Sequence, residues 1–260
     1  MTVLTLLLLA GACLGSLTTL ILGKFLTQGE LMDYQILIVY PLQFIPAMLY
    51  ASGKSHRNEG FDTTGVPLDD GRFSPIGGLW LALMAAVATI ACALVTEPVV
   101  ELLPDMPESI KNMMEMLTGG PLWVALLSTA VFAPIFEEWL CRGMILRGML
   151  KKYSPTVAII ISAAFFAVIH MNPWQAIPAF VLGCLFGLVY YKTGSLKLTM
   201  LMHCANNAFS ILLTRIPGAQ DKEYIYELFS DKVCYGFVYA ACLALVIYFA
   251  TRLIKTEFTK

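Results

Sequence analysis

The chain has 260 residues, of which 58% are hydrophobic and 13% are charged. Because about 25% of the residues of a soluble domain are charged, this composition excludes an ordinary soluble protein and indicates a polytopic membrane protein. The formal net charge of -1 offers no basic surface for nucleic acid, which we exclude as a partner.

Apolar segments of roughly spanning length recur along the whole chain, each bounded by charged residues, Gly or Pro. They predict an all-α fold, a polytopic transmembrane bundle of about eight helices. We expect these helices at 3–23, 35–51, 76–97, 121–150, 155–170, 174–191, 196–214 and 233–254. The fifth and sixth are short, and only Met171-Asn172-Pro173 joins them, a tight hairpin whose Pro suits the start of a helix.

The segment at about 107–117 has the pattern of a short helix that lies on the membrane surface. Ile110, Met113, Met114 and Leu117 share one face of this helix, and charged or polar residues occupy the other face. We expect an interfacial anchor, and a gate or substrate guide is the alternative.

The sequence predicts a single integral membrane domain with three parts. Residues 1–120 hold the first helices and the interfacial helix, 121–214 form a core with polar residues, and 233–254 form the last transmembrane helix. If eight segments cross the membrane, 11 of the 17 Lys and Arg residues lie in the termini and loops of one side. The positive-inside rule then places both termini in the cytoplasm, and we expect a multi-pass protein of the plasma membrane.

Ionisable residues within the predicted helices are the main functional signal. Glu137, Glu138 and Arg142 lie in the fourth predicted helix, where one charge at the bilayer centre costs about 2.5–3.5 kcal/mol. Glu138 and Arg142 are i, i+4 neighbours and can pair, whereas Glu137 points about 100° away around the helix axis, towards a different partner.

Two later helices carry further polar residues at the same spacing. Phe166 and His170 are four residues apart, and so are His203 and Asn207. Each of the three helices therefore presents one polar stripe, a row of side chains along one face of the helix. We expect the stripes to face a common interior and to form an acid/base site inside the membrane.

The three motifs, E-E-x-x-x-R from 137, F-x-x-x-H from 166 and H-x-x-x-N from 203, occur in this order. Together they resemble the signature of the CPBP family, the CAAX-processing and bacteriocin-processing (Abi-like) intramembrane glutamate proteases. The similarity extends over residues 121–210 and includes the N-P-W-Q run at 172–175 and the T-G-S-L turn at 193–196.

The resemblance implies a catalytic role for four matching residues. Glu137 would be the general base that activates a water molecule, and His170 would help to hold that water. His203 and Asn207 would stabilise the oxyanion that forms on the substrate. Hydrolysis of a peptide bond requires both functions, a base and donors aimed at the developing negative charge.

Three other residues of the motifs would support this site. By the same resemblance, Glu138 and Arg142 would form a structural ion pair beside the catalytic residues. Phe166 would pack in a wall of the site. A buried pair of this kind fixes helix geometry without taking part in the chemistry.

These observations predict an intramembrane endopeptidase that acts on a membrane-associated substrate, either a prenylated CAAX-type protein or a leader peptide. We expect no metal or other cofactor, although Glu137, His170 and His203 could also supply a two-His, one-carboxylate zinc site for a metal-dependent protease. A non-catalytic membrane binding or immunity protein, or a small transporter, is the alternative from another class. The lipid bilayer is the remaining expected partner, and no oligomeric state is indicated.

Overall fold

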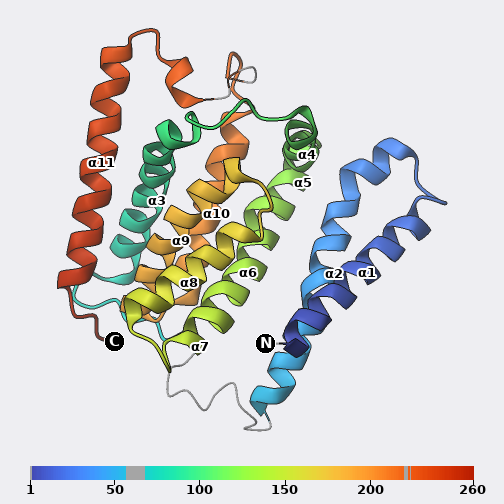
Figure 1. Cartoon of the computed structure of the whole chain (residues 1–260), viewed down its shortest axis with the longest axis horizontal. Helices are drawn as coiled ribbons and strands as arrows, with labels where there is room; N and C mark the ends of the chain where they lie inside the picture. Colours follow the sequence, from blue (N-terminus) through green and yellow to red (C-terminus); the bar gives the residue numbers. More distant parts are fainter. Residues whose placement is uncertain (1, 57–67, 220–221, 223) are drawn as a thin grey trace. The chain divides into compact units, whose positions relative to one another are not determined.

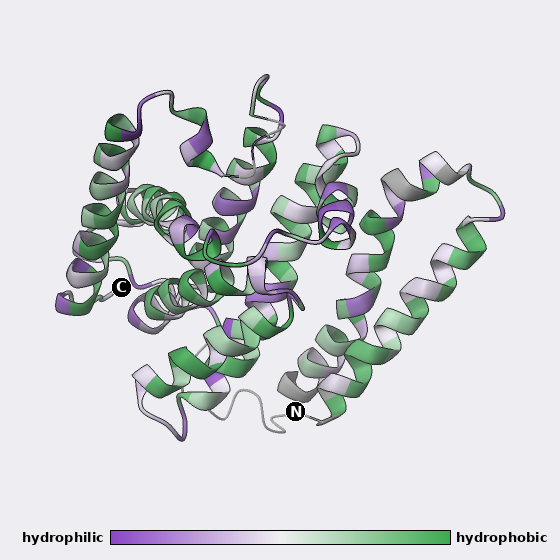
Figure 2. Cartoon of the chain, turned by 45° about the horizontal axis from the view of Figure 1, so that its top comes forward, coloured by the Kyte–Doolittle hydropathy of each residue, from purple (hydrophilic) through white to green (hydrophobic). Residues whose placement is uncertain are grey.

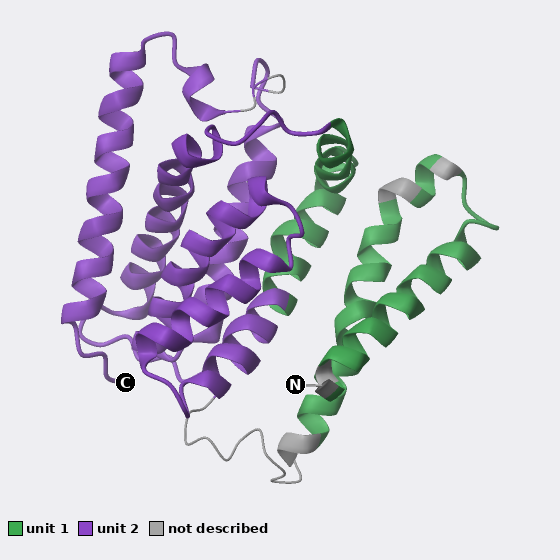
Figure 3. Ribbon diagram, in the orientation of Figure 1, with its two compact units in different colours: residues 1–67, 108–136 green, residues 68–107, 137–260 purple. Residues whose placement is uncertain are grey.

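The structure, a computed structural model, describes residues 2–56, 68–219, 222 and 224–260. These residues are mostly helical, and an isolated bridge between Ser74 and Thr259 is the one β-type pairing among them (Figure 1). The predicted all-α polytopic fold is confirmed. The chain divides into two compact units, each formed by two separate stretches of the sequence (Figure 3).

The first unit comprises the described parts of 1–67 and 108–136. Helices α1 (Thr2–Leu22) and α2 (Gln28–His56) pack along each other, and the absence of a side chain at Gly11 lets α1 approach the backbone of α2 closely. The unit continues with α4 (Glu108–Thr118), α5 (Leu122–Ala125), the π-helix η1 (Leu126–Phe132) and the first residues of α6 (Ala133–Glu138).

The second unit comprises the described parts of 68–107 and 137–260. Its helices are α3 (Gly78–Val100), the π-helix η2 (Trp139–Leu146), α7 (Arg147–Met149), α8 (Pro155–Val168), α9 (Pro173–Thr193), α10 (Leu196–Leu213), the short 3₁₀ helix η3 (Ile225–Leu228) and α11 (Lys232–Lys255). The core lies where α3, α9, α10 and α11 meet, and Leu81, Phe186, Met202 and Leu253 are buried there.

Among the described residues, six helical segments are long and apolar enough to cross a membrane: Thr5–Leu22, Tyr34–Gly53, Gly78–Val100, Leu122–Met149, Pro173–Thr193 and Lys232–Lys255. Hydrophobic residues predominate along these helices (Figure 2). Large apolar side chains such as Leu20, Leu79 and Phe237 are exposed on the isolated chain, as expected where lipid covers a protein. The protein is therefore an integral, multi-pass membrane protein.

The predicted number of eight spans is not confirmed, although all eight predicted segments are helical. Helix α8 has 14 residues and is classed as a shorter apolar helix, and α10 is not among the six segments. A helix of 14 residues rises only about 21 Å, which is less than the thickness of the bilayer's hydrocarbon core. The predicted orientation and the division into 1–120, 121–214 and 233–254 stay predictions.

Two local predictions are refined by the structure. The amphipathic helix is found as α4 with no buried residue, and its role as an anchor or a gate stays a prediction. The predicted helix 155–170 is too long, because α8 ends at Val168 and His170 lies in the turn that follows. Met171 has a φ of 57°, which turns the chain back, and α9 begins at Pro173 as expected.

The predicted fourth span is continuous but not a uniform α-helix. The π-helices η1 and η2 flank α6, which carries both adjacent glutamates. Such widened turns occur often at functional sites, because they displace side chains from regular α-helical positions. Between the second and third predicted helices, residues 57–67 lie outside the described residues.

Candidate active site

Glu138 and Arg142 form the predicted ion pair at the centre of the second unit. Arg142 Nη1 donates a hydrogen bond of 2.7 Å to Glu138 Oε1, and both side chains are 0% exposed. Arg142 Nη2 donates a second hydrogen bond, of 2.9 Å, to the carbonyl oxygen of Gly183 on α9. The guanidinium thus joins η2 to α9 as well as neutralising the buried carboxylate.

Two aromatic rings cover the guanidinium of Arg142. Its central carbon lies 4.8 Å from the ring centroid of Phe166 on α8 and 5.2 Å from that of Phe186 on α9. A cation over the face of an aromatic ring is attracted by the ring's quadrupole, and the attraction is strongest away from water. Phe166 therefore holds the ion pair, and it also contacts both histidines of the predicted site.

His203 of α10 lies between the two glutamates. Its Nδ1 atom is 3.1 Å from Glu138 Oε1, and its Nε2 atom is 4.0 Å from Glu137 Oε2. Because an ionised carboxylate can only accept hydrogen bonds, the proton on Nδ1 is donated to Glu138. The exposed fractions of the two side chains are small, 6% for His203 and 13% for Glu137.

His170 reaches the same region from the turn after α8. Its ring meets the ring of Phe166 edge to face with centroids 5.0 Å apart, and the ring of His203 meets Phe166 in the same way at 5.4 Å. His170 Nδ1 lies 2.8 Å from the carbonyl oxygen of Phe166 and must be the donor, since a carbonyl only accepts. In the neutral ring, Nε2 is then an acceptor.

The N-P-W-Q run fixes the backbone of His170. Asn172 is the N-cap of α9, and its side-chain oxygen accepts a hydrogen bond of 2.9 Å from the backbone of Gln175. Its amide nitrogen donates to the carbonyl oxygen of His170 at 2.9 Å and to Gln175 Oε1. One side chain therefore both starts α9 and holds the turn in which His170 lies.

Asn207 lies on α10, one turn beyond His203. It is half-buried, and its carboxamide oxygen accepts a hydrogen bond of 3.0 Å from Asn206 Nδ2. That bond turns the amide nitrogen of Asn207 away from Asn206. The structure thus brings Glu137, Glu138 and His203 into direct proximity, whereas Asn207 extends the same face of the helix.

Sequence reasoning did not identify four contributors to the site: Gly183, Phe186, Asn172 and Asn206. The backbone oxygen of Gly183 and the ring of Phe186 have no distinctive sequence signal, because any residue has a carbonyl and apolar segments contain many aromatic residues. The cap at Asn172 had such a signal, since Asn followed by Pro is typical of a helix start.

The possible zinc site of Glu137, His170 and His203 falls within the described residues. Among these residues, no group of three or more His, Cys, Asp or Glu side chains is arranged to hold a metal ion. The Nδ1 atom of each histidine is already engaged, with Glu138 and with Phe166, which leaves the Nε2 atoms to face the site. The absence of a metal from the reaction stays a prediction.

Comparison with known protein families connects this geometry to a known class. Residues 119–209, which contain all three motifs, match the family described as type II CAAX prenyl endopeptidase Rce1-like. These residues form an Rce1-like domain. The assignment confirms the resemblance to CAAX and CPBP proteases, and it supports intramembrane endopeptidase activity. No curated protein and no solved structure gives a significant match to the chain.

The Rce1-like domain begins in the first unit and continues through the second, from just before α5 to within α10. It thereby includes every residue of the candidate site and both partners of the buried ion pair. Helices α3 and α11 lie outside the matched residues, yet α3 packs against α9 and α10. Helices α3 and α11 thus contribute buried side chains to the same hydrophobic core as α9 and α10 of the Rce1-like domain.

Proposed function

We propose that this protein is an intramembrane endopeptidase in which Glu137 activates a water molecule for attack on a peptide bond. The strongest support is the position of His203, whose two ring nitrogens lie 3.1 Å from Glu138 and 4.0 Å from Glu137. Titratable groups gathered in a largely buried site are a hallmark of acid/base catalysis. The Rce1-like domain supports the same class of reaction.

In the proposed reaction, the water oxygen attacks the carbonyl carbon as Glu137 takes one of its protons. The second hydrogen of the water donates to Nε2 of His170, which is an acceptor because Nδ1 donates to Phe166. A tetrahedral intermediate forms with its charge on the former carbonyl oxygen. The C–N bond then breaks, and Glu137 returns its proton to the leaving amine.

His203 and Asn207 are the proposed donors to this oxyanion. With Nδ1–H directed at Glu138, Nε2 of His203 can donate only when the ring is an imidazolium, so the carboxylate of Glu138 stabilises the form required. Arg142 in turn holds Glu138 in place. Removal of one oxyanion donor in other enzymes costs about 10²–10³ in kcat.

The proposed substrate is a membrane-associated peptide, either a prenylated CAAX-type protein or a leader peptide. The isosteric variant Glu137→Gln tests both the mechanism and the substrate. It should fold normally and lose cleavage, and the peptides that accumulate in its membranes identify the substrate. Glu115→Gln on the exposed helix α4 is the matched control and should cleave normally.

Unchanged processing by Glu137→Gln would contradict this mechanism and would favour the non-catalytic binding or immunity function. The same preparations distinguish the metal-dependent alternative. We propose that the reaction needs no metal, so purified protein should hold far less than one zinc per chain and should keep its activity with a chelator. Stoichiometric zinc whose removal abolishes cleavage would overturn that proposal.

We further propose that the protein resides in the plasma membrane with both termini in the cytoplasm, as the distribution of Lys and Arg indicates. Reporter fusions that are active only on one side of the membrane test this orientation. A reporter at the C-terminus should show the cytoplasmic phenotype. An external signal would reverse the assignment.

A further inference from the structure

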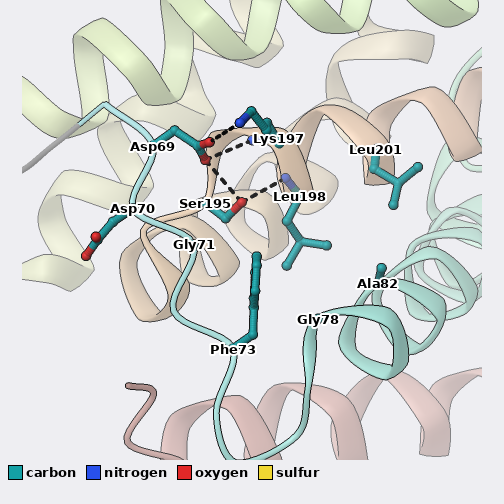
Figure 4. Close-up of a pocket in the computed structure, with 10 residues that line it drawn as sticks. All are labelled: Asp69, Asp70, Gly71, Phe73, Gly78, Ala82, Ser195, Lys197, Leu198 and Leu201. Carbon is teal, nitrogen blue, oxygen red and sulfur yellow. Dashed lines mark hydrogen bonds and ion pairs between the residues drawn. The ribbon is translucent and has the colours of Figure 1, made fainter. Parts of the chain in front are cut away.

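A short segment before α3 crosses the turn between α9 and α10 (Figure 4). We call residues 68–74 the strap. Backbone nitrogens of Asp70 and Arg72 donate to the carbonyl oxygens of Gly194 and Thr193, each at 2.8 Å. The hydroxyl of Tyr190 donates to the carbonyl oxygen of Leu68 at 3.0 Å. Three hydrogen bonds therefore join the strap to the end of α9 and to the turn that follows it.

Asp69 of the strap caps the first turn of α10. Its Oδ1 accepts a hydrogen bond of 2.8 Å from the backbone nitrogen of Leu196. The same oxygen accepts from Ser195 Oγ at 3.2 Å and from the backbone nitrogen of Lys197 at 3.4 Å (Figure 4). Its Oδ2 pairs with Lys197 Nζ at 3.1 Å. The first turn of a helix has unpaired N–H groups and a positive dipole end, so a carboxylate there is stabilising, typically by about 0.3–1 kcal/mol.

The turn itself is shaped to receive the strap. Gly194 has a φ of 67°, a conformation that favours glycine, and it ends α9. A Cβ atom on Gly194 would lie 2.9 Å from Cβ of Asp70. A larger residue here would both strain the turn and push the strap away.

The C-terminal tail holds the strap from another side. Ser74 and Thr259 exchange two backbone hydrogen bonds of 3.0 and 3.2 Å. Lys260 Nζ lies 2.9 Å from Asp70 Oδ1, and Phe258 is buried in the core of the second unit. The strap is thus fixed between the tail and the α9–α10 turn.

The strap and the start of α10 also line a pocket of about 510 Å³ that is open to the surface (Figure 4). Its lining combines apolar residues with polar ones: Phe73, Gly78, Ala82, Leu198, Leu201, Asp69, Asp70, Gly71, Ser195 and Lys197. Within α10, Ser195 is the N-cap residue, and its hydroxyl accepts a hydrogen bond of 3.2 Å from the backbone nitrogen of Leu198. Asp69 adds a second cap from outside the helix, and this cap links the first turn of α10 to the strap.

We propose that Asp69 is a positioning residue for His203. By capping α10, it fixes the position of the helix along its axis and so maintains the hydrogen bond from His203 Nδ1 to Glu138. His203 lies seven residues beyond Leu196, about 10 Å along the helix. A displacement of about 1 Å at a reacting group can cost about 10²-fold in rate. The expected effect on activity rests on the proposed protease function.

Kinetics of peptide cleavage by purified variants test the proposal. Asp69→Ala should lower kcat by at least about tenfold and leave KM within about twofold, because the substrate site itself is intact. Asp69→Asn keeps an oxygen that can accept from Leu196 and should recover most of the loss. Asp231→Ala is the matched control and should cleave like wild type, because it removes the cap of α11, a helix that carries no residue of the candidate site.

Wild-type kcat in Asp69→Ala would overturn the proposal, as would equal losses in the Ala and Asn variants. The chain has only three histidines, so ¹⁵N-histidine labelling provides a readout without substrate. The Nδ1 signal of His203 should change in Asp69→Ala, and that of His170 should not. If Asp69→Ala does not fold, Asp69→Glu, which moves the carboxylate by one methylene, should show both effects.

The cleavage kinetics and the NMR signal of His203 together distinguish the positioning role of Asp69 from the proposed protease function. If wild type cleaves no peptide but Asp69→Ala shifts the His203 signal, the protease function fails and the positioning role stands. If wild type cleaves and the His203 signal is the same in Asp69→Ala or Asp69→Glu as in wild type, the positioning role is wrong.

Discussion

Replacement of Arg142 by Met should destabilise the protein strongly, because it leaves Glu138 as a buried carboxylate without its cation. Both side chains are 0% exposed, and breaking a buried pair on one side costs about 3–5 kcal/mol. The Gly183 carbonyl also loses its donor, and the rings of Phe166 and Phe186 lose the guanidinium between them. At about 2–4 °C per kcal/mol for a chain of this size, Tm should fall by about 6–20 °C.

Thermal unfolding of the purified protein in one detergent measures this change. Lys111→Met is the matched control, since Lys111 forms an i, i+3 pair with Glu108 at 3.8 Å on the surface of α4. Such exposed pairs contribute about 0–1 kcal/mol, so this variant should unfold close to wild type.

The double variant Glu138→Gln/Arg142→Met should recover much of the lost stability, because it removes the unpaired charge while a side-chain oxygen remains for His203. The reasoning would be refuted if Arg142→Met were no less stable than Lys111→Met. It would also be refuted if the losses in the double variant were simply additive, since a coupled pair requires a large interaction energy.

Three further predictions concern the helices around the site. Gly183→Ala places a Cβ atom 3.0 Å from Ala163 of α8 and should lower the free energy of unfolding by about 1–3 kcal/mol. The control is Gly236→Ala, whose Cβ would meet nothing within 4 Å and which should be neutral or slightly stabilising. Equal effects of the two variants would contradict the close packing of α9 against α8. Asn172→Ala removes the cap of α9 and should lower the free energy of unfolding by about 1 kcal/mol. It should also reduce the rate of cleavage, because the carbonyl oxygen of His170 loses its donor. Normal stability and a normal kcat would disprove this link. Asn207→Asp removes an amide donor and should lower kcat by about 10²–10³ at nearly constant KM, and a change in KM alone would argue against an oxyanion role.

Local physical chemistry explains which parts of the fold were predictable. A run of apolar residues long enough to cross a bilayer must be helical, because lipid offers no partner for a free backbone group. The helices α1, α3, α9 and α11 therefore begin and end within a few residues of the predicted positions. The Asn-Pro start of α9 and Gly194 at its end also carried recognisable signals.

The candidate site was predictable only where its contacts are local. The i, i+4 spacing indicated the Glu138–Arg142 pair, and the structure contains it. The same spacing gave no information about the Gly183 carbonyl, 41 residues away in the chain, because every residue has such an oxygen. The contact of Glu138 with His203, 65 residues away, likewise has no local pattern.

The amino-acid sequence by itself determined that this is a helical membrane protein and which side chains are the candidates for its chemistry, since hydrophobic length and motif spacing are properties of a single segment. Only the tertiary structure decided how these segments meet. His203 lies near the middle of α10 and Glu137 in the middle of a long helical stretch, so their proximity depends on how α10 is placed against the segment that carries Glu137. That placement results from packing in the core and from the capping of α10 by a distant aspartate, and neither is encoded in the pattern of one helix.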